Sequence, residues 1–266
     1  MFTQQLRIIE INPTELCNLK CNFCPRSTFY PNQNLNMSLD TAREIARQLK
    51  SIEYKHELSI TGRGEPTLHP QFEELCNIFM EDRTWTLKIN TNTKRFDRYY
   101  DTIMQFDRVI YNLYEHDEIE WQDHYLRFLD HPNVIVKSKP KEMNWTDKAT
   151  FTNRAGSFPT NQIPQDGRCE VIFIKMFIDY DGTYRLCCED WKDKISLGNI
   201  FDTEIKDHIE NNEELKSYRR TLIKGNRCKV PCINCTHMIE HNKYKSSSAE
   251  KWKELEWLVK KENHGV

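Results

Sequence analysis

Short apolar runs rich in β-branched residues alternate, over the first half of the chain, with segments whose apolar residues recur every three or four positions. The runs predicted to be strands cover residues 7–12, 57–61, 86–92, 108–114, 133–139 and 149–153. The segments with helical spacing cover residues 38–52, 71–80 and 118–129, and Ser38 is a suitable N-cap for the first. Because strands and helices alternate, we expect an α/β fold in which parallel strands are joined by crossover helices.

The pattern changes after Gly156. Two strand-like runs at residues 171–179 and 183–187 flank the turn signal Tyr180-Asp181-Gly182, which predicts a β-hairpin. Helical patterns follow at residues 203–224 and 249–261. We therefore expect a first domain over residues 1–156, a second module over residues 157–245 and a C-terminal helix within residues 246–266.

The charged residues give the chain no strongly basic face. Its 38 Lys and Arg and 40 Asp and Glu side chains are mixed along the sequence and leave a formal net charge of −2. This balance argues against a nucleic-acid partner. The first residues lack the charged start and apolar stretch of a secretory signal, and no apolar run is long enough to cross a membrane. We expect a soluble, cytoplasmic protein without a membrane partner.

The ten cysteines fall into two groups. Three lie between Cys17 and Cys24, six lie between Cys169 and Cys235, and Cys76 stands alone on a predicted helix, where it is expected to be buried. Without a secretory signal, such cysteines indicate metal binding rather than disulfides. Two metal centres are therefore predicted.

The first group offers three thiolates, Cys17, Cys21 and Cys24, on the loop after the first predicted strand. A four-iron cluster needs one ligand per iron, so three cysteines leave one iron open to a small molecule that carries an amine and a carboxylate. The alternative is a structural zinc site, which requires four ligands, and no fourth cysteine or histidine stands nearby.

The spacing Cys17-x3-Cys21-x2-Cys24, with Phe23 before the third cysteine, resembles the defining motif of the radical S-adenosylmethionine (SAM) superfamily. The resemblance implies a partial, six-stranded TIM-like barrel in which a 4Fe-4S cluster binds SAM. The segment 61–70 resembles the family's glycine-rich turn after the second strand, although Arg63 stands where many relatives have glycine. The candidate SAM-binding residues are Phe23, Gly62, Gly64, Glu65, Asn92 and Asn112.

The second group of cysteines resembles the auxiliary-cluster extension called SPASM, or its shortened form called twitch. In these relatives one cysteine precedes a hairpin, another closes it after a glycine, and a later Cys-x2-Cys pair completes the set. The resemblance implies one auxiliary 4Fe-4S cluster, held in a module of a β-hairpin plus a helix. Its candidate ligands are Cys169, Cys187, Cys232 and Cys235.

Two alternatives concern the same cysteines. Cys188 is expected to point away from Cys187 if both lie on a strand, but either Cys188 or Cys228 could replace one of the four ligands. Cys228, Cys232 and Cys235 could also form a zinc knuckle with His241. In that case the chain would be a metal-stabilised binding module rather than an enzyme.

The resemblance implies that a 5′-deoxyadenosyl radical abstracts hydrogen from the substrate and that the auxiliary cluster accepts an electron. We expect a two-electron oxidation of a small hydroxylated substrate, such as a sugar or cyclitol, because the twitch group includes an aminocyclitol dehydrogenase. Arg154 is the candidate for holding the substrate hydroxyl, with a structural ion pair as its alternative role. A peptide-modifying reaction is the alternative activity, and a flavodoxin or ferredoxin is the expected reductant.

Overall fold

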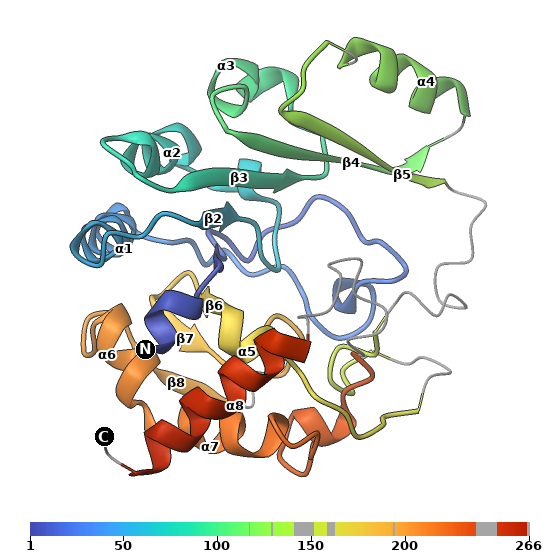
Figure 1. Ribbon diagram of the computed structural model, residues 1–266. Helices are drawn as coiled ribbons and strands as arrows, with labels where there is room; N and C mark the ends of the chain where they lie inside the picture. Colours follow the sequence, from blue (N-terminus) through green and yellow to red (C-terminus); the bar gives the residue numbers. More distant parts are fainter. Residues whose placement is uncertain are drawn as a thin grey trace.

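A computed structural model describes residues 1–116, 118–128, 130–140, 152–158, 163–193, 195–237 and 249–264. Its centre is an eight-stranded sheet with the order β5-β4-β3-β2-β1-β6-β7-β8 (Figure 1). The strands are β1 (Ile8–Ile11), β2 (Glu57–Ile60), β3 (Thr86–Thr91), β4 (Arg108–His116), β5 (Val134–Pro140), β6 (Lys175–Ile178), β7 (Thr183–Arg185) and β8 (Ser196–Asn199). The pairs from β5 to β6 are parallel, whereas β7 and β8 are antiparallel to their neighbours.

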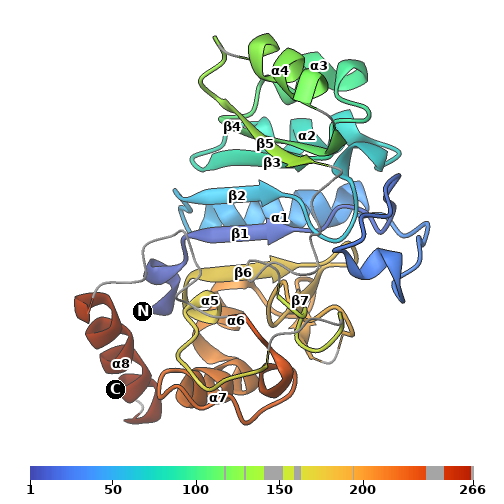
Figure 2. The same ribbon diagram turned by 90° about the vertical axis from the view of Figure 1, so that its right-hand side faces the viewer.

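The helices of the first half connect these parallel strands; three of the four were expected, and the short helix between β3 and β4 was not. They are α1 (Leu39–Ser51), α2 (Phe72–Met80), α3 (Tyr100–Ile103) and α4 (Glu118–Arg127), and they follow one another along the sheet (Figure 2). Ser38 caps α1, because its side chain accepts a hydrogen bond from the Thr41 N–H. Apolar residues such as Ile9, Ile11 and Leu58 are fully buried between these layers. The predicted α/β architecture is confirmed.

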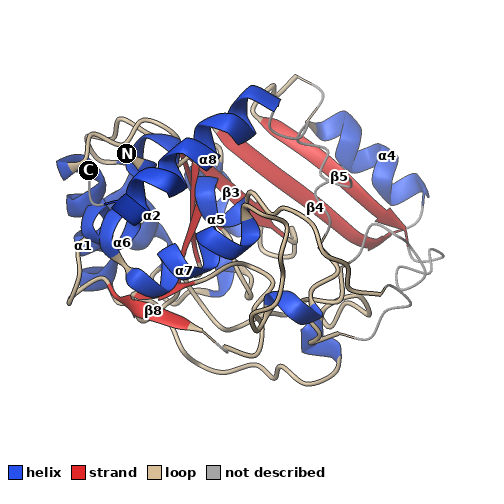
Figure 3. Ribbon diagram, turned by 60° about the horizontal axis from the view of Figure 1, so that its bottom comes forward, coloured by secondary structure: helices blue, strands red, loops and turns tan. Residues whose placement is uncertain are grey.

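The second half contributes α5 (Val171–Ile174), α6 (Ile205–Asn211), α7 (Glu213–Leu222) and α8 (Ala249–His264) (Figure 3). Short 3-10 turns lie at Phe2–Gln5, Pro25–Ser27, Pro66–Leu68, Asp97–Tyr99 and Cys232–Asn234. The helix expected over residues 203–224 is interrupted at Asn212, whose side chain accepts a hydrogen bond of 2.9 Å from the Leu215 N–H and so starts α7.

Two strand expectations differ from the structure. The run from residue 171 begins as the helix α5 and becomes a strand only at Lys175, because an apolar run of this length suits either element. The strand expected at residues 149–153 lies mostly outside the described residues, and Thr152 and Asn153 have no strand structure. The next parallel strand of the sheet is instead β6, which pairs with β1 from Ile8↔Lys175 to Ile11↔Ile178.

The parallel strands direct their carboxyl ends to one edge of the sheet. Asn12, Thr61, Asn92 and Asp179 lie at or just after the ends of β1, β2, β3 and β6. Loops at this edge carry the functional groups of parallel α/β folds. No helix in the described part of the chain is long and apolar enough to span a membrane.

Candidate active site

The loop after β1 brings Cys17, Cys21 and Cys24 to one cavity of about 280 Å³. The Cys17 N–H donates to Asn32 Oδ1 and the Asn32 amide donates back to the Cys17 carbonyl, both at 2.8 Å. The Cys24 N–H donates to the Cys21 carbonyl at 2.9 Å. The three thiols therefore sit on a loop whose backbone is held in place, and burial raises the pKa of the Cys17 thiol.

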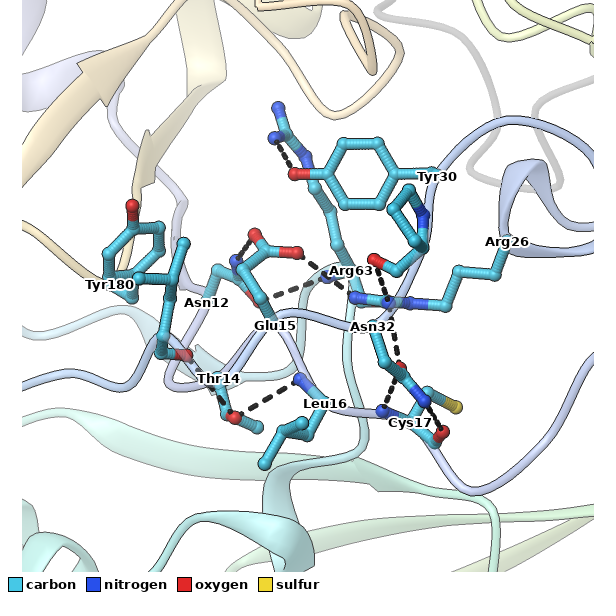
Figure 4. A network of polar contacts seen from close by, with 12 residues as sticks. Asn12, Thr14, Glu15, Leu16, Cys17, Arg26, Tyr30, Asn32, Arg63 and Tyr180 are labelled. Atoms are coloured by element: carbon cyan, nitrogen blue, oxygen red, sulfur yellow. Dashed lines mark hydrogen bonds and ion pairs between the residues drawn. The ribbon is translucent and has the colours of Figure 1, made fainter.

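A buried ion pair fixes the base of this loop (Figure 4). The Arg26 guanidinium lies 3.0 Å from the Glu15 carboxylate, and their side chains are only 3% and 1% exposed. Arg26 also donates from Nε to the Arg63 carbonyl at 2.5 Å, while Asn12 donates to Glu15 at 2.6 Å. The pair thus connects the cysteine loop to β1 and to the turn after β2.

The turn after β2 lies directly against the cysteine loop and needs glycine at two positions. Gly62 has φ +119°, and a Cβ on it would overlap the Asn12 side chain. A Cβ on Gly64 would overlap the Thr14 carbonyl, and the adjacent Glu65 N–H donates to the Leu16 carbonyl at 2.7 Å. Only glycine allows the turn to lie this close to Asn12 and Thr14, and both glycines border the cavity.

Glu65 borders the same cavity, but protein donors occupy its buried carboxylate. Oε1 accepts hydrogen bonds from Thr67 Oγ1 at 2.8 Å and Thr91 Oγ1 at 2.7 Å, and Oε2 accepts one from the Asn92 N–H at 2.6 Å. Burial raises the pKa of Glu65 even though these donors lower it. In this structure Glu65 joins the turn after β2 to the end of β3.

The other expected SAM-binding residues line the opposite walls of the cavity. The Asn92 amide donates to Asn18 Oδ1 at 2.7 Å and lies 3.9 Å from Cys17 Sγ, while Asn112 extends from β4. Phe23 packs against Tyr114 with ring centroids 5.6 Å apart. Sequence reasoning missed Tyr114 as a site residue, although it lies two positions after Asn112 and so faces the same side of β4.

A second cavity of about 300 Å³ adjoins the first. Both are bordered by Thr61, Arg63, Asn90, Arg154 and Trp191. The second cavity also reaches residues from the other half of the chain, including Asp179, Arg185, Cys187 and Cys188. It therefore lies between the three-cysteine cavity and the cysteines that follow the hairpin.

Arg63 connects the two halves of the chain. Its guanidinium donates to Tyr30 Oη at 2.8 Å, to the Asp190 carbonyl at 2.9 Å and to Asp193 Oδ1 at 2.5 Å. It also lies 5.4 Å from the Tyr30 ring centroid and 5.7 Å from that of Trp191. Figure 4 shows the Arg63–Tyr30 contact. The arginine that departs from the usual glycine thus fastens the cysteine loop to the segment after β7.

Arg154 borders both cavities and has the positive φ of +49°. Its Nη1 forms an ion pair of 3.0 Å with Glu189, which also accepts a hydrogen bond from Thr152. Burial lowers the pKa of Arg154, but Glu189 together with Cys188 and Cys24 outweighs burial, and the net shift is upward. The alternative role, an ion pair between the two halves, is therefore present, and Arg154 also borders both cavities.

Two carboxylates of the second cavity were missed from the sequence. Glu10 extends from β1, and burial raises its pKa while Lys175 and Lys88 oppose that rise. Asp179 forms an ion pair with Arg185, whose Nε donates to it at 2.9 Å, and it also accepts a hydrogen bond from the Asn12 amide at 2.7 Å. A charged residue within the otherwise apolar strand Ile8–Ile11 was the signal that could have identified Glu10.

A third, small cavity is bordered by Cys169, Cys187, Cys232 and Cys235, the four cysteines expected to bind the auxiliary cluster. Cys169 precedes α5, Cys187 follows β7, and the other two bracket the 3-10 turn Cys232–Asn234. Burial raises the pKa of each thiol, to about 12 for Cys232 and Cys235, and neighbouring cysteines further raise the pKa values of Cys187, Cys232 and Cys235. Four thiols in this arrangement become stable thiolates only around a cationic centre, which suits an iron–sulfur core.

The remaining cysteines of this half have other positions. Cys188 borders the second cavity and not the third, although it lies beyond the end of β7 rather than on a strand. Cys228 is exposed. Among the described residues, no three His, Cys, Asp or Glu side chains are arranged to hold a single metal ion. His241 of the zinc-knuckle alternative lies outside the described residues.

Comparisons with known families match both halves. A family model described as the radical SAM superfamily matches residues 11–130. The SPASM model, described as an iron–sulfur cluster-binding domain, matches residues 169–236. The first range includes the cysteine loop and the glycine turn, and the second includes the four cysteines of the third cavity.

Individual relatives have low sequence identity but similar length. The chain is 21% identical over 246 residues to the S-adenosyl-L-methionine-dependent 2-deoxy-scyllo-inosamine dehydrogenase of Niallia circulans, covering 87% of this chain and 93% of that protein. The crystal structure of BtrN in complex with AdoMet and 2-DOIA superposes with a TM-score of 0.75 at 22% identity, covering 88% and 94%. Native anSMEcpe with bound AdoMet gives 0.54 at 14% identity, covering 97% of each chain.

These likenesses agree with the geometry at each level. The parallel sheet matches the partial-barrel fold, the three-cysteine cavity lies in the radical SAM region, and the four-cysteine cavity lies in the SPASM region. The two regions imply SAM and iron–sulfur clusters as cofactors, and the residues present fit both groups. Residues 11–130 thus match the radical SAM superfamily and residues 169–236 a SPASM-type iron–sulfur cluster-binding domain, and the protein is a radical SAM enzyme.

Proposed function

We propose that the protein is a radical SAM dehydrogenase that oxidises a hydroxyl group of a small polyhydroxylated substrate, such as a sugar or aminocyclitol. The main support for this proposal is the position of the second cavity. It adjoins the three-cysteine cavity through Gly62 and Arg63, and it borders Cys187 of the four-cysteine group on its other side. A substrate there would be next to both cofactors.

The proposed ligands follow from the cavities. Cys17, Cys21 and Cys24 hold the SAM-binding cluster and leave one iron open, and the four cysteines of the third cavity hold a closed auxiliary cluster. When bound, these groups supply hydrogen abstraction by a 5′-deoxyadenosyl radical and a nearby one-electron acceptor. The protein contributes orientation and the exclusion of water.

The walls of the first cavity position SAM. We assign the turn at Gly62 and Gly64 to its methionine end, because both glycines border the cavity beside the cysteine loop. Phe23, Asn92 and Asn112 are assigned to its adenosine end, since one aromatic ring and two amides face the cavity there. Glu65 supports this wall through its bonds to Thr91 and Asn92.

The walls of the second cavity suit a compact polar substrate. Arg154 donates hydrogen bonds to a substrate hydroxyl and keeps its charge, because arginine stays protonated in proteins. Glu10 faces the same cavity and receives no hydrogen bond from the described residues, so it accepts one from a hydroxyl or ammonium group of the substrate. A volume of about 300 Å³ is at the small end of ligand sites.

The relatives support a small substrate and name one alternative. The dehydrogenase of Niallia circulans acts on an aminocyclitol according to its name. The structure of anSMEcpe with a bound Cp18Cys peptide, with a TM-score of 0.55 at 14% identity, represents the peptide-modifying alternative. The size and charge of the second cavity favour the small substrate. A flavodoxin or ferredoxin is the proposed reductant.

The test offers the reconstituted enzyme two kinds of labelled substrate. Deuterated aminocyclitols and sugars are supplied in one set of anaerobic reactions and deuterated peptides in another, and 5′-deoxyadenosine is examined for deuterium. Transfer from a cyclitol or sugar, together with its ketone product, is expected. Transfer only from peptides would refute the dehydrogenase proposal.

A further inference from the structure

Arg227 is a buried cation beside the four-cysteine cavity. Its side chain is only 4% exposed and borders the same cavity as Cys169, Cys187, Cys232 and Cys235. Nε donates to the Gly167 carbonyl at 3.0 Å and Nη1 to the Cys235 carbonyl at 3.4 Å. Nη2 is buried and has no hydrogen-bond partner in the described part of the chain.

The surroundings of Arg227 do not neutralise its charge. The guanidinium forms no ion pair with a carboxylate of the described residues, in contrast to Arg154, which faces Glu189. Glu189 also borders the third cavity, but Arg154, Thr152 and His237 surround its carboxylate. A buried unpaired charge is costly unless a counter-charge is close.

The thiols themselves are candidates for that counter-charge. Arg227 borders the same cavity as the four cysteines, and its Nη1 donates to the main-chain carbonyl of Cys235, so its charge lies beside their thiols. Its two bonds to main-chain carbonyls hold the guanidinium at this position. The unoccupied Nη2 donor is then available to an iron–sulfur core or its thiolates.

We infer that Arg227 is a positioning residue for the auxiliary cluster that supplies its counter-charge and makes it easier to reduce. Four thiolates around a 4Fe-4S core of charge 2+ give a net charge of −2, and uptake of one electron gives −3. A fixed cation favours the more negative state, so it raises the reduction potential. The inference rests on the proposed function, in which one electron from the substrate radical reduces this cluster.

The test measures the auxiliary cluster alone, in the full chain with Cys17, Cys21 and Cys24 replaced by alanine. About four irons per chain should remain in this background. The midpoint potential of the cluster is then determined by a redox titration followed by electron paramagnetic resonance. A background protein without iron would overturn both the auxiliary-cluster assignment and the role of Arg227.

The same potential is measured for three further variants. Arg227→Gln should lower the equilibrium constant for one-electron reduction at least tenfold, which corresponds to about 59 mV. Arg227→Lys, which keeps the charge, should recover most of this loss. Arg168→Gln is the control, since Arg168 adjoins Cys169 in sequence but pairs with Glu256 at the surface, and it should leave the potential unchanged.

The outcomes separate a charge effect from a structural one. An Arg227→Gln protein that holds four irons at an unchanged potential overturns the inference. If Arg227→Gln does not assemble the cluster, the Arg227→Lys variant distinguishes the two effects. A cluster that assembles in Arg227→Lys, with the same midpoint potential as in the background protein, supports the role of the charge. If neither variant assembles the cluster, the inference is overturned, because the loss of the cluster then follows from the two broken hydrogen bonds to main-chain carbonyls and not from the charge.

Discussion

Replacement of Arg26 by methionine tests whether the buried Arg26–Glu15 pair holds the cysteine loop. The substitution keeps most of the side-chain volume and removes the charge. It leaves the Glu15 carboxylate, which is 1% exposed, with the Asn12 amide as a donor. It also removes the hydrogen bond to the Arg63 carbonyl.

The expected loss is large because one charge of a buried pair is left behind. Breaking such a pair costs about 3–5 kcal/mol of the free energy of unfolding. The exposed pair Arg43–Asp40, with side chains 59% and 84% exposed, is the matched control. Arg43→Met should cost less than about 1 kcal/mol, because solvent screens exposed pairs.

The assay is anaerobic guanidinium unfolding of the two single variants and of the double variant Arg26→Met with Glu15→Gln. The double variant should be more stable than Arg26→Met alone, since glutamine leaves no unpaired charge. Equal unfolding free energies for Arg26→Met and Arg43→Met would refute the reasoning. A double variant no better than the single one would show that the lost hydrogen bonds, not the uncompensated charge, account for the effect.

Three further predictions concern single positions. Gly64→Ala should abolish SAM binding, measured by equilibrium dialysis, because its Cβ would overlap the Thr14 carbonyl. Burial against the Tyr184 ring lowers the pKa of His208 to about 4, so the folded protein leaves it neutral while the unfolded chain binds a proton below about pH 6.5. The free energy of unfolding, which is highest above pH 6.5, should therefore fall by about 2 kcal/mol between pH 7 and pH 5. The His208→Phe variant should not show this fall in unfolding curves. The same pH dependence in the variant would contradict the assignment of the effect to His208. The Cys232→Ala variant should still cleave SAM with a strong reductant yet form little ketone. Because Cys228 is exposed, the Cys228→Ala variant should keep both activities and its iron. Loss of iron in Cys228→Ala would show that the proposed set of cluster ligands is wrong.

Local patterns explain why much of the fold was predictable. Alternating strand and helix periods indicated parallel strands, and Ser38 marked the start of α1. Cys17, Cys21 and Cys24 were placed correctly on the loop after β1, because the motif lies between two clear elements. These features depend on residues that are close together in the sequence.

Features that depend on distant contacts were not predictable. The contact of Arg63 with Asp193 spans 130 residues. The sequence therefore showed only that Arg63 stands where many relatives have glycine, and not which residues it contacts. The role of residues 171–174 was ambiguous because an apolar run fits a helix or a strand. Glu10 became a site candidate only when β6 was seen beside β1, which completes the wall of the second cavity.

The pairing of β1 with β6 limits how this enzyme can be re-engineered. The two strands share a parallel register over four residue pairs, so the auxiliary region is built onto the same sheet as the SAM-binding region. Excising that region as a cassette would expose the edge of β1, and unpaired strand edges promote aggregation. A graft between relatives would have to carry β1 together with β6, and changes of substrate are better sought in the cavity side chains than in exchanged modules.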